Sequence, residues 1–129
     1  MARKRLIAIV DDDPSVREGL VDLIIAMGFK AEAFKSAENF LSSPCLARTA
    51  CLIADVRMPG MNGLELLEQL IASGKTIPTI LITAFTQEID RTRALNSGAI
   101  CYLSKPFDRH EFMECVRAAL SSSNPQRTT

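Results

Sequence analysis

Short, largely apolar runs alternate along the chain with longer segments in which apolar residues recur every three or four positions. The short runs are typical of buried strands, and we expect strands at residues 6–10, 30–34, 51–54, 79–82 and 100–103. The periodic segments are typical of amphipathic helices, which we expect at about 14–27, 64–73, 86–97 and 108–120, with a shorter helix opening at Ser36. The chain therefore consists of five strand–helix units.

The ends of the predicted helices carry residues that commonly begin and end helices. Asp13 can cap the first helix, and Pro14 suits its first turn, where no backbone N–H donor is needed. Gly28, Gly74 and Gly98 follow three of the helices, at the position where a left-handed residue is common. These boundary signals agree with the periodicity.

The alternation of strands and helices predicts an α/β fold. Strands joined by helices run parallel, and the helices then cover both faces of the sheet. Right-handed crossovers restrict the strand order, and the flavodoxin-like order 2-1-3-4-5 places a ligand site between the first and third strands. We therefore expect a doubly wound, five-stranded parallel sheet in that order.

Polar residues stand at the downstream ends of four of these strands. Asp11 and Asp12 follow the first strand, Asp55 the third and Thr83 the fourth, while Lys105 lies just past the fifth. Parallel strands end at one edge of a sheet, so we expect these side chains to converge there. Carboxylates and a lysine are costly to bury without partners, whereas carboxylate oxygens suit Mg²⁺. The pattern predicts a cation and phosphate site, in which Asp55 could form an aspartyl-phosphate.

The composition argues against several other classes of protein. Lysine plus arginine and aspartate plus glutamate number 15 each, so the chain lacks the positive charge that nucleic-acid binding requires. No apolar run approaches the roughly 20 residues of a membrane span, and the basic start lacks a signal peptide's apolar region. The four cysteines are scattered, so a zinc site is not expected. We expect a reduced, cytoplasmic protein that does not bind membranes.

Four short motifs occur in order at the predicted strand ends: Asp-Asp, Asp-x-x-Met-Pro-Gly, Thr-Ala and Lys-Pro-Phe. Together, over about residues 5–121, they resemble the receiver domain of two-component response regulators. Asp-Val-Arg-Met-Pro-Gly-Met-Asn-Gly and Lys-Pro-Phe are similar to receivers that precede helix-turn-helix domains in nitrogen-fixation-type transcriptional regulators.

The resemblance implies an acceptor and a metal site. Asp55 would accept a phosphoryl group from a partner histidine kinase. Asp11, Asp12 and Asp55, together with the backbone carbonyl of Arg57, would hold Mg²⁺, with Mn²⁺ as an alternative. The Lys105–Pro106 peptide bond is cis in many members of this family.

The resemblance also implies residues that sense the phosphoryl group. Thr83 and Lys105 would contact its oxygens, and Tyr102 would be the aromatic switch that turns inward when Thr83 moves. Arg57 and Phe85 would flank the phosphoryl group, and neither is an obvious water-activating residue. We hypothesise that Phe85 shields the phosphoryl group and lengthens its lifetime.

The expected output is a change in the surface formed by the fourth helix, the fifth strand and the fifth helix. Dimerisation through that surface is a common result in the family, and the charged residues in this region are Asp90, Arg91, Arg93 and Asp108. The output would be control of transcription, with DNA bound only by an output domain absent from this chain. Residues 1–121 would form the receiver, and 122–129 a polar tail or the start of a linker.

Two alternatives stay open for these residues. An aspartate-nucleophile phosphohydrolase usually has a second aspartate two positions after the nucleophile, where this chain has Arg57, and 129 residues leave no room for a cap domain. A pseudo-receiver would use the same fold as an interaction module without phosphorylation. We expect a phosphoacceptor that assists its own phosphorylation and dephosphorylation and is not otherwise an enzyme.

Overall fold

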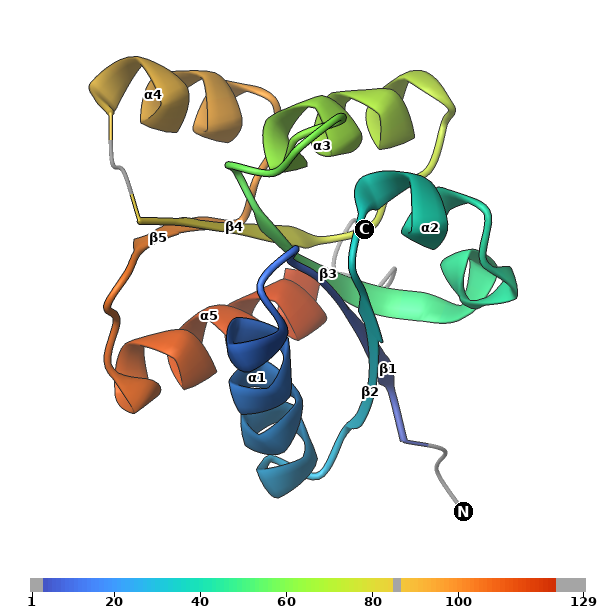
Figure 1. Cartoon of the computed structure of the whole chain (residues 1–129), viewed down its shortest axis with the longest axis vertical. Coiled ribbons are helices and arrows are strands. Elements are labelled where there is room, and N and C mark those ends of the chain that lie inside the picture. The colour runs from blue at the N-terminus through green and yellow to red at the C-terminus, as the bar shows by residue number, and fades with distance from the viewer. Residues whose placement is uncertain (1–3, 85–86, 123–129) are drawn as a thin grey trace.

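The computed structural model describes residues 4–84 and 87–122. Within these residues, five parallel strands form one sheet in the order β2-β1-β3-β4-β5 (Figure 1). The strands are β1 (Leu6–Val10), β2 (Lys30–Phe34), β3 (Thr49–Asp55), β4 (Thr79–Thr83) and β5 (Cys101–Ser104). The predicted doubly wound sheet and its strand order are confirmed.

Helices cover both faces of the sheet (Figure 1). The helices are α1 (Pro14–Ala26), α2 (Ala37–Leu41), α3 (Gly63–Ala72), α4 (Glu88–Asn96) and α5 (Arg109–Ser122), with a 3-10 helix, η1 (Pro44–Arg48), before β3. Side chains of α1 and α5 pack on one face, and those of α2, α3 and α4 pack on the other. No helix in the described part of the chain is long and apolar enough to cross a membrane.

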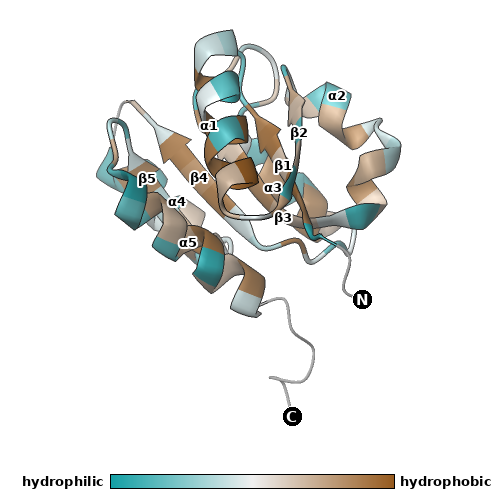
Figure 2. Cartoon of the chain, turned by 90° about the horizontal axis from the view of Figure 1, so that it is seen from below, coloured by the Kyte–Doolittle hydropathy of each residue, from teal (hydrophilic) through white to brown (hydrophobic). Residues whose placement is uncertain are grey.

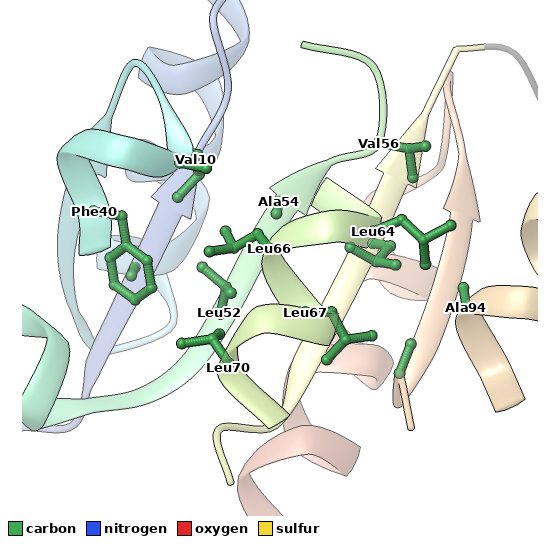
Figure 3. Close-up of a cluster of buried hydrophobic side chains, with 14 of the residues drawn as sticks. Val10, Phe40, Leu52, Ala54, Val56, Leu64, Leu66, Leu67, Leu70 and Ala94 are labelled. Atoms are coloured by element: carbon green, nitrogen blue, oxygen red, sulfur yellow. The ribbon is translucent and has the colours of Figure 1, made fainter. Parts of the chain in front are cut away.

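The core lies in two layers, one on each side of the sheet. Along β1, Ala8 and Val10 face the layer under α2 and α3, whereas Ile7 and Ile9 face the layer under α1 and α5. Figure 2 shows β1 and β4 as hydrophobic strands between these helices, and Figure 3 shows the layer around Phe40. Strands buried on both faces have continuous apolar sequences, and their rigid packing fixes the residues at their ends.

Several element boundaries differ from the predicted ones. β3 begins at Thr49, because a register shift beside Leu6 extends its pairing with β1, and it continues to Asp55 through pairing with β4. η1 was not predicted; its first turn is stabilised by Ser43, whose hydroxyl accepts a hydrogen bond from the backbone N–H of Cys45. The predicted start of the fourth helix lies outside the described residues, and the domain boundary at residue 121 stays a prediction.

The close approach of α3 to the end of β3 depends on Gly63. A Cβ atom there would collide with the carbonyl oxygen of Asp55 and would lie 3.2 Å from Leu81 Cδ2. Asn62 caps α3 by accepting from the backbone N–H of Glu65, and the Glu65 carboxylate accepts from the backbone N–H of Asn62. The loop that follows Asp55 is therefore held firmly where α3 begins.

Candidate functional site

Two buried aspartates lie at the carboxyl edge of the sheet. Asp55 is the last residue of β3 and is 6% exposed, and Asp11 directly follows β1 and is fully buried. Asp11 is held in place because its backbone N–H donates to the carbonyl of Phe34, while its carbonyl accepts from Arg17 Nη1 at 2.7 Å. The contact from Arg17 was not predicted, because nothing in the sequence of α1 distinguishes that arginine.

Lys105 joins these two carboxylates. Its Nζ atom donates to Asp55 Oδ2 at 3.0 Å and to Asp11 Oδ2 at 3.3 Å. Its backbone N–H donates to the carbonyl of Thr83 at 2.7 Å, which ties the loop after β5 to the end of β4. The Lys105–Pro106 peptide bond is cis. The structure thus brings together three of the residues that the strand-end pattern selected.

Burial and the neighbouring charges shift two pKa values at this site. Burial raises the pKa of Asp11, and the charge of Asp55 adds to the rise; the backbone N–H of Asp13 and the charge of Lys105 oppose it. Burial alone would lower the pKa of Lys105, but its hydrogen bonds to Asp55 and Asp11 and the charges of both carboxylates together raise it. The lysine therefore stays protonated at neutral pH.

The site has the donor set of a hard cation. Asp11, Asp12 and Asp55 each offer a carboxylate oxygen, and these atoms lie within 4.8 Å of one another. Asp11 and Asp55 are buried and held in place by the protein, whereas Asp12 is exposed. The three carboxylates are therefore open to solvent at Asp12. Three carboxylates facing one ammonium leave an excess of negative charge. These residues therefore fit Mg²⁺, which binds a few carboxylates and keeps some of its water ligands.

Arg57 adjoins the site through its backbone. Its N–H donates to Asp55 Oδ1 at 2.9 Å, and its guanidinium extends away to pair with Asp90 on α4, with Nη2 3.3 Å from Oδ2. The pairing of Arg57 with Asp90 was not predicted, since the two residues lie 33 positions apart.

Two further predicted residues lie close to the same edge. Thr83 is fully buried at the end of β4, directly beside Ser104 of β5 in the sheet register. Tyr102 on β5 is also buried, and its hydroxyl has no hydrogen-bond partner among the described residues. Burial, followed by the charge of Asp90, raises the pKa of Tyr102. Phe85 lies outside the described residues, so its predicted place beside the acceptor is not tested.

The fold and the site define an α/β domain with an acidic, lysine-bridged centre at the switch point of its sheet. The family model of the response regulator receiver domain matches residues 7–117. The chain therefore belongs to the response regulator receiver family, as its four motifs indicated.

Known relatives agree with this assignment. The chain is 38% identical over 126 residues to the response regulator protein TodT of Pseudomonas putida, covering 98% of this chain and 56% of TodT. It is 37% identical over 118 residues to the transcriptional regulatory protein FixJ of Azorhizobium caulinodans, covering 92% of this chain and 56% of FixJ. The solved structure of the response regulator StyR superposes with a TM-score of 0.88 at 40% identity, covering 98% of this chain and 64% of StyR.

The chain spans only about half the length of the curated relatives it matches. The similarity to FixJ agrees with the resemblance of the motifs to nitrogen-fixation-type regulators.

Proposed function

We propose that this chain is a phosphorylation-controlled switch whose acceptor is Asp55. The observation that supports this most directly is the contact of Lys105 with both Asp55 and Asp11, because it places a fixed cation beside the carboxylate that would receive the phosphoryl group. A phosphorylated histidine kinase is the proposed donor, as family membership suggests.

Mg²⁺, or Mn²⁺ in its place, would be held by Asp11, Asp12, Asp55 and the carbonyl of Arg57, and would neutralise charge on the transferred group. The residues of the chain supply the rest of the chemistry. An Asp55 carboxylate oxygen attacks the phosphorus, forming a P–O bond while the P–N bond breaks and its electron pair returns to the imidazole of the donor. Lys105 transfers a hydrogen bond from Asp55 to a phosphoryl oxygen, and the Thr83 hydroxyl donates to another.

The proposed output follows from the position of the sensing residues. Thr83 lies at the end of β4 beside β5, which carries Tyr102, so a change at Thr83 reaches the surface formed by α4, β5 and α5. This surface would then bind a second copy or an output domain, and the similarity to FixJ suggests control of transcription. DNA would be contacted only by such an output domain, and the switch would operate in the cytoplasm.

We also propose that Phe85, two residues after Thr83, shields the phosphoryl group from water. Replacing it with alanine should then accelerate loss of the phosphoryl group, measured by intact mass after the donor is removed. An unchanged rate of loss in Phe85→Ala would eliminate the shielding role.

The central experiment is phosphorylation by a small acyl phosphate with Mg²⁺, followed by intact mass. We expect a gain of one phosphoryl group in the wild type, none in Asp55→Asn, and none when EDTA removes the metal. Asp22→Asn is the matched control, because it removes an exposed aspartate of α1 that does not belong to the group of Asp11, Asp12 and Asp55. A folded wild-type protein that gains no phosphoryl group from the acyl phosphate or from a phosphorylated histidine kinase would identify a pseudo-receiver.

A further inference from the structure

Helix α4 has little hydrophobic contact with the rest of the protein. Among its described residues only Ala94 is buried, and its larger apolar residues Ile89 and Leu95 are 75% and 44% exposed. Gln87, the N-cap residue that precedes the helix, makes no side-chain capping hydrogen bond. Elements with few buried apolar contacts open and shift most easily, so polar contacts decide how firmly α4 is held.

Two ionic contacts attach α4 to the body of the protein within the described residues. Near its C-terminal end, Arg93 donates from Nε and Nη2 to the carboxylate of Glu68 on α3 at 2.9 and 2.6 Å, and Ser97 Oγ donates to the same carboxylate at 3.3 Å. In its first turn, Asp90 pairs with Arg57 from the loop after β3. Removing either contact would loosen one end of the helix.

The first-turn contact leads directly to the proposed phosphoacceptor. Arg57 touches Asp55 through its backbone N–H and touches α4 through its guanidinium. The ion pair is accessible to solvent, since the side chains of Arg57 and Asp90 are 47% and 22% exposed. Exposed pairs are weak and exchange partners readily. A stronger anion within reach of Arg57 would therefore displace Asp90.

We propose that the Arg57–Asp90 pair is a latch on α4 that a phosphoryl group on Asp55 releases. The phosphoryl oxygens would draw the guanidinium of Arg57 away from Asp90, because arginine binds phosphate through two parallel charge-assisted hydrogen bonds. Asp90 is then a positioning residue that keeps Arg57 on α4 until phosphate is present. This inference rests on the proposed function of Asp55, and it gives phosphorylation a route to α4 besides Thr83 and Tyr102.

The latch is tested first in the unphosphorylated protein, by hydrogen exchange of peptides that cover residues 88–96. Asp90→Asn and Arg57→Gln should each accelerate exchange in the first turn of α4, roughly two- to fivefold, the factor expected for loss of an exposed ion pair. Glu88→Gln is the matched control, since it removes an acid from the same helical turn without breaking the pair. Wild-type exchange rates in both latch variants would overturn the proposal.

The second measurement separates a role at the acceptor from a purely structural one. Although both variants release α4, Asp90→Asn frees Arg57 to meet the incoming phosphoryl group, whereas Arg57→Gln removes the guanidinium. With a small acyl phosphate and Mg²⁺, Asp90→Asn should be phosphorylated faster than wild type and Arg57→Gln more slowly. Equal rates in the two variants would show that Arg57 does not contact the phosphoryl group.

The two proposals can fail independently. If the wild type gains no phosphoryl group, the proposed function fails, while the exchange rates of the unphosphorylated variants still report whether the pair holds α4. If Asp55 is phosphorylated but exchange in α4 of the wild type does not then rise toward that of Asp90→Asn, the function stands and the latch is wrong.

Discussion

The ammonium of Lys105 reaches across the end of β4 to lie 3.0 Å from a carboxylate oxygen of Asp55 on β3. The same nitrogen lies 3.3 Å from Asp11, so one lysine balances two buried carboxylates from different strands. The two carboxylates are therefore held by one charged donor, together with the backbone N–H of Asp13 at Asp11 and that of Arg57 at Asp55.

Replacing Lys105 with methionine should lower the free energy of unfolding by about 1–3 kcal/mol, because two buried carboxylates lose a hydrogen-bond donor. Mg²⁺ should restore more stability in this variant than in wild type, since the cation then faces a more negative site. Chemical unfolding with and without Mg²⁺ measures both effects, and Lys75→Met removes an exposed lysine as the control. A Lys105→Met protein as stable as wild type without metal would contradict the bridging role.

Replacing Asp11 should raise the stability of the protein, whereas replacing Lys105 should lower it. Its pKa is raised above 3.8 in the folded protein, chiefly by burial, so its ionised form is less favourable when folded than when unfolded. Asp11→Asn should therefore raise the free energy of unfolding at neutral pH, on the order of 1 kcal/mol as for other substitutions that relieve a functional site. The same variant should lose the thermal stabilisation that Mg²⁺ gives to wild type.

The pH dependence provides the check on Asp11. As the pH falls through the raised folded-state pKa toward 3.8, wild-type Asp11 takes up a proton and its unfavourable contribution disappears. The stability advantage of Asp11→Asn should thus be full at neutral pH and shrink on acidification. An advantage that grows as the pH falls would mean that the folded protein favours the ionised carboxylate.

The convergence of Asp11, Asp55 and Lys105 could be predicted from sequence because it depends only on where strands end. Parallel strands of similar length place their downstream residues at one edge, whatever the details of packing. The partner of Arg57 could not be predicted in this way. A long arginine side chain has many rotamers, and its contact with Asp90 depends on the position of a helix that buries only one residue.

The extent of β3 also depends partly on local sequence and partly on tertiary structure. Apolar residues 51–54 were recognisable as a strand, but Thr49 joins β3 through a register shift opposite Leu6, a tertiary feature with no local sequence signal. Asp55 was expected to follow the strand, and it is the final residue of the strand because its backbone pairs with Ile82. Placing Asp55 inside the sheet explains why its carboxylate is so well buried.

Two glycine-to-alanine substitutions should have opposite effects on stability, one where α3 packs on β3 and one within α1. Gly63→Ala should lower the free energy of unfolding by about 1–3 kcal/mol, because its Cβ would collide with the Asp55 carbonyl. Gly19→Ala should raise it by about 0.5–1 kcal/mol, because Gly19 lies within α1 with open space around it. Urea unfolding measures both, and equal effects would contradict the close approach at Gly63.

The hydroxyl of Tyr102 gives a further stability prediction. It is buried without a hydrogen-bond partner among the described residues, which is unfavourable for a polar group. Tyr102→Phe should therefore raise the free energy of unfolding of the unphosphorylated protein by about 1 kcal/mol. A loss of similar size in urea unfolding would show that the hydroxyl is hydrogen-bonded in solution.

The contact between α3 and α4 should depend on pH. The hydrogen bond from Arg93 lowers the pKa of Glu68 below 4.5 in the folded protein, so the ionised carboxylate favours folding. This contribution is present above pH 4.5 and is lost as the pH falls through the lower folded-state pKa. The difference in thermal stability between wild type and Glu68→Gln should therefore be present at neutral pH and vanish in acid. A difference in thermal stability that does not depend on pH would mean that Glu68 acts through packing and not through its charge.

Hydrogen exchange provides a second measurement of the same contact. Glu68→Gln should accelerate exchange in the last turn of α4. Glu114→Gln, the control, removes an exposed acid of α5 and should leave exchange in α4 unchanged.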